Sequence, residues 1–153
     1  MTKVRLLCVE SDTGFRVLYH ALLQSHGFSV HVTQNSAAAL DYFRDAPVQA
    51  ALIAQDLEGA ISGIELAAQF KLRAPELPVV IVSNCESVVE DARHFVDGAI
   101  CRNASLDSLV VLMKSLTKQE VTASQEIRIG IPVAQLRDRS AVQRAQAFFT
   151  SAS

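Results

Sequence analysis

Pro78-Val79-Val80-Ile81-Val82 is the most strand-like stretch of this 153-residue chain, because β-branched side chains favour the pleated surface of a sheet. The stretch is apolar throughout and lacks the alternation of a strand with one face in water, so it predicts a strand covered on both faces. Apolar residues at helical spacing flank it, with Leu66, Ala67 and Phe70 before it and Val88, Ala92 and Phe95 after it. A buried strand between two amphipathic helices is typical of an α/β fold.

The same alternation of strand and helix continues in both directions along the chain. Further strand-like runs occupy Val4 to Val9, Phe28 to Thr33, Ala50 to Ala54 and Ala99 to Cys101. Five βα repeats with short connections require a parallel sheet, since parallel neighbours need crossover helices. The usual solution is the flavodoxin-like three-layer sandwich with strand order 2-1-3-4-5, which gathers functional side chains at the carboxyl ends of its strands.

Bulk composition limits the classes of protein to which this chain could belong. Half of the residues are hydrophobic and 20% are charged, which indicates a globular chain, and the net charge of −2 argues against broad nucleic-acid binding. No apolar run reaches the ~18 residues of a membrane span, and the N-terminus lacks the features of a secretory signal, so we expect a cytoplasmic protein. The cysteines have no metal-ligand spacing and are expected to be free thiols, with Cys8 and Cys101 in the core and Cys85 beyond a strand end.

Several segments, in order and at matching spacing, resemble the bacterial two-component receiver domain from about Lys3 to Thr117. They are Leu6 to Asp12 (Leu-Leu-Cys-Val-Glu-Ser-Asp), Asn35 to Phe43, Gln55 to Leu66, Leu77 to Ser83 and Asp97 to Arg102. The resemblance implies a receiver-like domain over 1–117, a role in signal transduction and a functional site at the end of the third strand.

At that site most residues depart from the family's pattern. Glu10 stands at the first acidic position and Ser11 at the second, metal-ligating one; Gln55 replaces the phospho-accepting aspartate, Ser83 keeps the hydroxyl, and Arg102 replaces the lysine. A neutral amide is not a competent nucleophile, and Mg²⁺ prefers carboxylate oxygens. The resemblance therefore implies a degenerate phosphorylation pocket with no catalytic residue, no metal ion and no other cofactor.

We expect the surviving polar residues, Glu10, Gln55, Ser83 and Arg102, to form a hydrogen-bonded network with an ion pair between Glu10 and Arg102. A pocket for a small ligand or anion is the alternative reading of the same residues. Asp56 belongs to the same pocket as a loop-start or capping residue.

A one-residue shift would instead make Asp56 the acceptor and would recruit Glu10 and Asp12 as ligands for Mg²⁺. That shift turns the side chain to the other face of the strand and shortens the loop to Gly63.

The last residues, 118–153, read as a linker with a short strand and helix appended. Residues 118–125 are polar, Ile127, Ile129 and Ile131 alternate as in a lone strand, and an apolar stripe predicts a helix from about Ala134 to Phe149. Three readings stay open: the segment packs on its own receiver, it docks a partner or a second copy, or it begins another domain.

The function we expect is that of a stand-alone atypical receiver, not an enzyme, that signals through protein contacts independent of phosphorylation. By resemblance, the partner is a histidine kinase, another regulator or a second copy, and it binds at Val88 to His94 and Ala99 to Lys114. The family's switch aromatic falls at Ala99, which favours a fixed state. The rival functions are an active receiver using Asp56 with Mg²⁺ and a nucleic-acid-associated regulator working through the tail.

Overall fold

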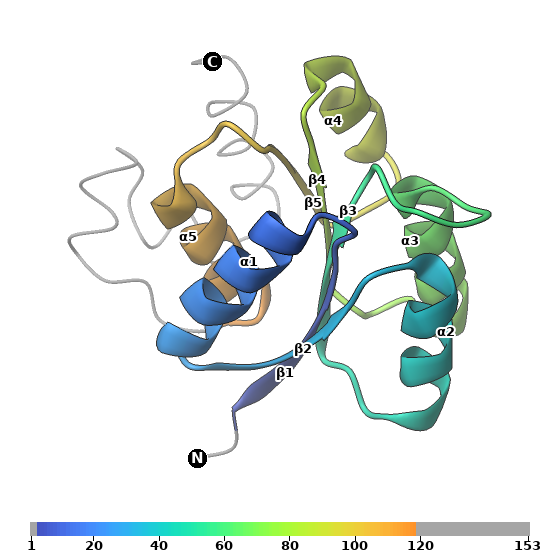
Figure 1. Ribbon diagram of the computed structural model, residues 1–153, viewed down its shortest axis with the longest axis horizontal. Helices are drawn as coiled ribbons and strands as arrows, with labels where there is room; N and C mark the ends of the chain where they lie inside the picture. The colour runs from blue at the N-terminus through green and yellow to red at the C-terminus, as the bar shows by residue number, and fades with distance from the viewer. Residues whose placement is uncertain (1–2, 119–153) are drawn as a thin grey trace.

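A computed structural model describes residues 3–118, which form three layers with a parallel sheet in the middle (Figure 1). The elements follow one another as β1 (Val4–Val9), α1 (Thr13–Ser25), β2 (Phe28–Thr33), α2 (Ser36–Asp45), β3 (Ala50–Ala54), α3 (Gly63–Arg73), β4 (Val79–Ser83), α4 (Glu86–Ala92), β5 (Gly98–Cys101) and α5 (Leu106–Leu116). The appendage predicted for 118–153 lies outside the described residues, apart from Lys118.

The five strands are all parallel and have the order β2-β1-β3-β4-β5, which confirms the predicted flavodoxin-like topology. Their register brings the carboxyl ends to one edge of the sheet. Val9 lies opposite Thr33 in β2 and Ile53 in β3, and Ser83 in β4 lies opposite Cys101 in β5. The polar residues that follow β1, β3 and β5 therefore meet at this edge.

Two apolar cores cover the two faces of the sheet. Helices α1 and α5 pack on one face, and α2, α3 and α4 pack on the other (Figure 1). Strands β3 and β4 are buried along their whole length, as their continuous apolar runs predict. Cys8 and Cys101 are buried and Cys85 is exposed, as expected; burial raises the pKa of the Cys8 thiol to about 12.

Side-chain caps fix where the helices begin. Asp12 accepts from the Phe15 amide at the start of α1, and Ser62 and Ser105 do the same for α3 and α5. Helix α2 is capped by Asn35, whose side chain accepts from the Ala38 amide. These caps hold the loops at the carboxyl edge of the sheet in place.

The predicted inward face of α4 is correct at Ala92 and wrong at Val88 and Phe95. Val89 and Ala92 are buried, and Val96 follows them into the core, whereas Phe95 is 61% exposed. Val89, Ala92 and Val96 lie at i, i+3 and i+7, and the Val96 amide bonds back to the Ala92 carbonyl as in a helical turn. The inward face therefore continues past the end of α4 and leaves Phe95 outside it.

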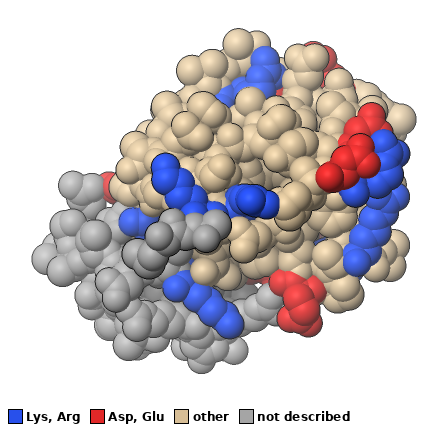
Figure 2. All heavy atoms as spheres, turned by 90° about the horizontal axis from the view of Figure 1, so that it is seen from below, with Lys and Arg blue, Asp and Glu red and all other residues tan. Residues whose placement is uncertain are grey.

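Charged residues are spread over the described surface. On the face in Figure 2, Lys and Arg side chains are scattered among uncharged residues, and acidic side chains lie towards its margin. None of the helices within 3–118 combines the length and the apolar character that a membrane span requires.

Candidate functional site at the carboxyl edge of the sheet

An open cavity of about 840 Å³ lies where β1, β3 and β5 end. Glu10, Ser11, Gln55, Asp56 and Arg102 line it, as the sequence predicts. The neighbouring loop contributes Asn84, whereas the expected Ser83 is not part of the wall.

A buried ion pair crosses the base of this cavity. Glu10 is only 2% exposed, and its Oε2 lies 3.1 Å from Nη2 of Arg102, so the ion pair predicted from sequence is present. The other carboxylate oxygen, Oε1, accepts the Asp12 amide at 3.1 Å. Both oxygens of Glu10 are thus engaged by donors from this chain.

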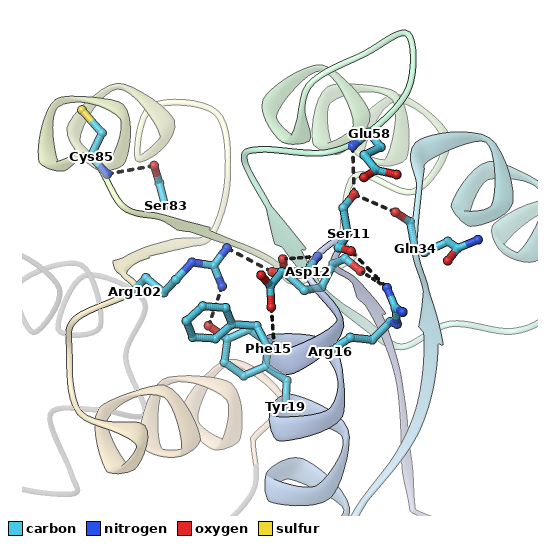
Figure 3. Close-up of polar contacts among 11 residues, drawn as sticks. Ser11, Asp12, Phe15, Arg16, Tyr19, Gln34, Glu58, Ser83, Cys85 and Arg102 are labelled. Atoms are coloured by element: carbon cyan, nitrogen blue, oxygen red, sulfur yellow. Dashed lines mark hydrogen bonds and ion pairs between the residues drawn. The ribbon is translucent and has the colours of Figure 1, made fainter.

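The guanidinium of Arg102 has two further contacts on α1. Its Nη1 donates to the Tyr19 hydroxyl at 3.1 Å, and its Cζ lies 4.0 Å from the centroid of the Phe15 ring (Figure 3). Burial raises the pKa of Tyr19 to about 12, against the opposing effect of Arg102. The sequence gives no signal of this role, because aromatic residues at helical spacing, such as Phe15 and Tyr19, are typical of a helix face that packs on the core.

Gln55 does not join the ion pair. Its Oε1 accepts the Ile64 amide at 2.8 Å, and its backbone carbonyl accepts the Gly63 amide at 3.0 Å. The side chain is therefore attached to the first turn of α3. Gly63 permits this approach, because a Cβ there would collide with the backbone carbonyl of Ala54.

Ser11 connects three loops rather than facing a metal position. Its hydroxyl donates to the Gln34 carbonyl at 2.7 Å and accepts the Glu58 amide at 2.8 Å (Figure 3). Arg16 supports the same loop by donating from Nη1 to the carbonyls of Glu10, at 2.9 Å, and Ser11, at 3.3 Å. No sequence motif signalled Arg16, whose contacts are all with backbone carbonyls or a neighbouring hydroxyl.

The remaining two predicted residues lie apart from the ion pair. Ser83 is buried, and its hydroxyl accepts the Cys85 amide at 3.1 Å, which turns it towards the start of α4. Asp56 is exposed at the wall of the cavity. The expected four-residue network is therefore reduced to the ion pair, with Gln55 and Ser83 each bound to the start of a helix.

Residues 6–110 match the response regulator receiver domain family. The chain belongs to this family. Receiver domains act in two-component signalling and interact with other proteins such as kinases.

A putative NtrX-like response regulator of Rickettsia felis is 30% identical to this receiver over 118 residues, covering 74% of this chain and 25% of that protein. Response regulator MprA of Mycobacterium sp. (strain KMS) is 24% identical over 119 residues, covering 76% and 51%. The chain thus spans a quarter to a half of the length of these relatives.

Solved receivers share the fold. The CheY-like receiver domain protein of Methanospirillum hungatei superposes with a TM-score of 0.69 at 19% identity, over 83% of this chain and 99% of that one. The NtrX receiver domain of Brucella abortus gives 0.68 at 24% identity, over 74% and 98%. TrrA of Thermotoga maritima, solved in complex with Mg²⁺-BeF, gives 0.69 at 21% identity, over 74% and 98%.

The residues of this receiver do not fit Mg²⁺ as they stand. Oxygen ligands must be free to turn towards the ion, but Glu10 is held by Arg102 and Asp12, and Ser11 is bound to two loops. The Gln55 oxygen already accepts an amide. Among residues 3–118, no three His, Cys, Asp or Glu side chains gather in an arrangement suited to a metal ion.

Proposed function

We propose that this receiver signals through protein contacts without taking up a phosphoryl group at the end of β3. The observation that carries the proposal is the Gln55 amide, held by the Ile64 amide at the start of α3. Acyl-phosphate formation needs an attacking carboxylate, and a neutral amide does not supply one. The side chain at this position therefore acts as a structural tie between β3 and α3.

The ion pair between Glu10 and Arg102 supports the proposal that the pocket stays in one conformation. In a working receiver, a metal ion neutralises the carboxylates and the phosphoryl oxygens. Here the guanidinium of Arg102 neutralises Glu10 from within the chain, at 3.1 Å. Tyr19 and Phe15 hold that guanidinium in position. The pocket therefore always contains a positive charge, and phosphorylation is not required to hold the pocket in this conformation.

The output of such a domain is binding, and we propose the face made by α4, β5 and α5 for it. Phe95 beside α4 is 61% exposed and Leu106 at the start of α5 is 41% exposed, and apolar groups of this kind favour protein contacts. Ala99 is fully buried in β5 and carries no ring that a phosphoryl group might reorient. We propose a binding module rather than an enzyme, with a histidine kinase, another regulator or a second copy as the partner.

Intact-protein mass after incubation with Mg²⁺ and acetyl phosphate tests the first step. The expected result is an unchanged mass, while an active receiver treated in parallel gains one phosphoryl group. An adduct that disappears in Asp56→Asn would overturn the proposal and would identify Asp56 as the acceptor. Asp56→Asn is a mild change, because this side chain is exposed.

A further inference from the structure

Helix α5 is buried on every side, unlike α1, which packs on the same face of the sheet. The residues from Ser108 to Ser115 are all buried, and eight consecutive residues of a helix point in every direction. In α1 only Tyr19 and Leu23 are buried, as expected for a helix with one side in water. The sheet covers one side of α5, so the burial of the other side needs a second cover.

Val111 marks the side of α5 that faces away from the sheet. Val111 is 1% exposed and belongs to neither apolar core of residues 3–118. Ser108 and Ser115 lie one turn before and one turn after it, at i−3 and i+4, and both are buried on the same side. We call these three residues the outer α5 strip. The core on the other side of the helix receives Leu109, Val110, Leu112 and Met113.

The segment that follows α5 is able to reach this strip. In Figure 1 no described helix or strand lies beyond α5 on the side away from the sheet. Lys118 has a left-handed backbone, with φ of 62°, and its amide bonds back to the Ser115 carbonyl, so the chain turns as the helix ends. Residues 119–133 would span up to about 50 Å when extended. The 11 residues of α5 span only about 17 Å, so the chain can return to any turn of the helix.

The sequence after this connection carries a complementary surface. The helix predicted from Ala134 to Phe149 has an apolar stripe on one side, and such a stripe needs a surface to cover. The outer α5 strip is uncharged and places Val111 between two small serines, which leaves room for large side chains to interdigitate. The stripe supplies two phenylalanines among smaller residues: Ala141, Val142, Ala145, Phe148 and Phe149.

We propose that the apolar stripe of residues 134–149 packs on the outer α5 strip of the same chain. The structure holds a single chain, so the burial of Val111 is a property of one copy and not of a pair. The docked segment shields the middle and the end of α5, whereas Leu106 at the start of the helix is 41% exposed. A partner of the α4, β5 and α5 face therefore meets Leu106 and Phe95 but not the later turns of α5; this consequence alone rests on the proposed function.

Thiol labelling of the full chain measures whether the outer α5 strip is covered. The probe is Ser115→Cys in a chain that also carries Cys85→Ser, because Cys85 is exposed whereas Cys8 and Cys101 are buried. The probe is a mild change, since the Ser115 hydroxyl has no hydrogen-bond partner among the described residues. With the segment docked, a maleimide should label it at least about tenfold more slowly than Leu72→Cys in the same background, where the native side chain is 83% exposed.

Two substitutions in the predicted helix identify the cover. Phe149→Asp places a charge in the apolar stripe and should speed labelling of Ser115→Cys at least about tenfold. Gln143→Asp places the same charge on the opposite side of that helix and should leave the rate unchanged. Cys8 and Cys101 should stay unlabelled in every variant, which reports an intact receiver.

Fast labelling of Ser115→Cys in the otherwise unchanged segment, or a rate indifferent to Phe149→Asp, would overturn the proposal. Protection that disappears on dilution would also overturn it, because a second copy would then provide the cover. Intact mass after acetyl phosphate treatment bears on the proposed function and the labelling rates bear on the docking, so either of the two can fail alone.

Discussion

Arg102 and Glu10 are the two residues whose interaction most determines the candidate site. The side chain of Arg102 is 10% exposed and that of Glu10 is 2% exposed, so both charges are largely shielded from water. Removing one member of such a pair leaves the other charge buried without compensation.

We therefore predict that Arg102→Met lowers the free energy of unfolding by about 3 kcal/mol. The double variant Glu10→Gln with Arg102→Met should recover part of that loss, because no isolated charge then remains. Urea denaturation of the two variants and the wild type measures both effects. Equal loss in the single and double variants would show that packing of the guanidinium, and not charge pairing, is responsible.

Tyr19 gives this cluster a signature at alkaline pH. Burial raises its pKa from 10.0 to about 12, which means that the folded chain favours the neutral phenol. The stability from this preference is fully present below pH 10 and is lost as pH rises towards 12. Spectroscopic titration of tyrosinate should show one late-ionising group that is absent in Tyr19→Phe. Complete ionisation of both tyrosines near pH 10 would contradict the prediction.

Among the elements, the strands were predictable and one helix face was not. The runs Val4 to Val9 and Ala50 to Ala54 are mostly apolar and of strand length, and their bounds match the structure. The inward face of α4 was predicted only at Ala92, because seven residues give too few turns to define its phase, and Phe95 is a larger apolar residue than its neighbour Val96.

The candidate site, like the helices and strands, was predictable only in part. The ion pair of Glu10 and Arg102 followed from two opposite charges at one edge of a parallel sheet. The partner of Gln55 did not, because the Ile64 amide comes within reach only through the shape of the β3–α3 loop. Periodicity carries no information on loop shape.

The junction of β3 and α3 depends on a single missing side chain. A Cβ at Gly63 would meet the backbone of Ala54 and Gln55, neither of which is free to move aside. We predict that Gly63→Ala destabilises the fold by about 2 kcal/mol, as overpacking does elsewhere. Gly14→Ala is the control: its new Cβ meets only Asp12 Oδ1, at 3.2 Å, and alanine favours a helix. Thermal unfolding of both variants measures the effect, and equal melting temperatures would contradict the prediction for Gly63→Ala.

The segment that follows α4 carries Phe95, the exposed aromatic residue that we propose for partner binding. Because Phe95 contributes little to the core, Phe95→Lys should change the free energy of unfolding by less than about 0.5 kcal/mol. Loss of an aromatic anchor should still weaken binding of a cognate kinase or regulator more than about tenfold. Leu72→Lys, also at an exposed apolar residue, should bind normally. Titration calorimetry with the purified partner tests this, and equal affinity for both variants would move the interface elsewhere.

At the scale of the whole molecule, the fold is shared with TrrA of Thermotoga maritima, which was solved in complex with Mg²⁺-BeF, at a TM-score of 0.69. The carboxyl ends of β1, β3 and β5 still meet at one edge, and Ser11, Gln55 and Arg102 occupy positions on it. Under the proposed function, the difference from a site that accepts a phosphoryl group would therefore lie in side chains and not in topology.

We therefore predict that phosphorylation can be restored by substitution. The triple variant Ser11→Asp, Gln55→Asp and Arg102→Lys supplies two carboxylates and a smaller cation, so it should bind Mg²⁺ and gain one phosphoryl group from acetyl phosphate. Adding Asp56→Asn should leave that adduct in place, which separates the restored position from the neighbouring carboxylate. The triple variant should also unfold at lower urea, because Ser11 no longer donates to the Gln34 carbonyl. Calorimetry with Mg²⁺ and intact mass are the measurements; a folded triple variant that binds no metal would show that the loops themselves, and not the three side chains, hold the site closed.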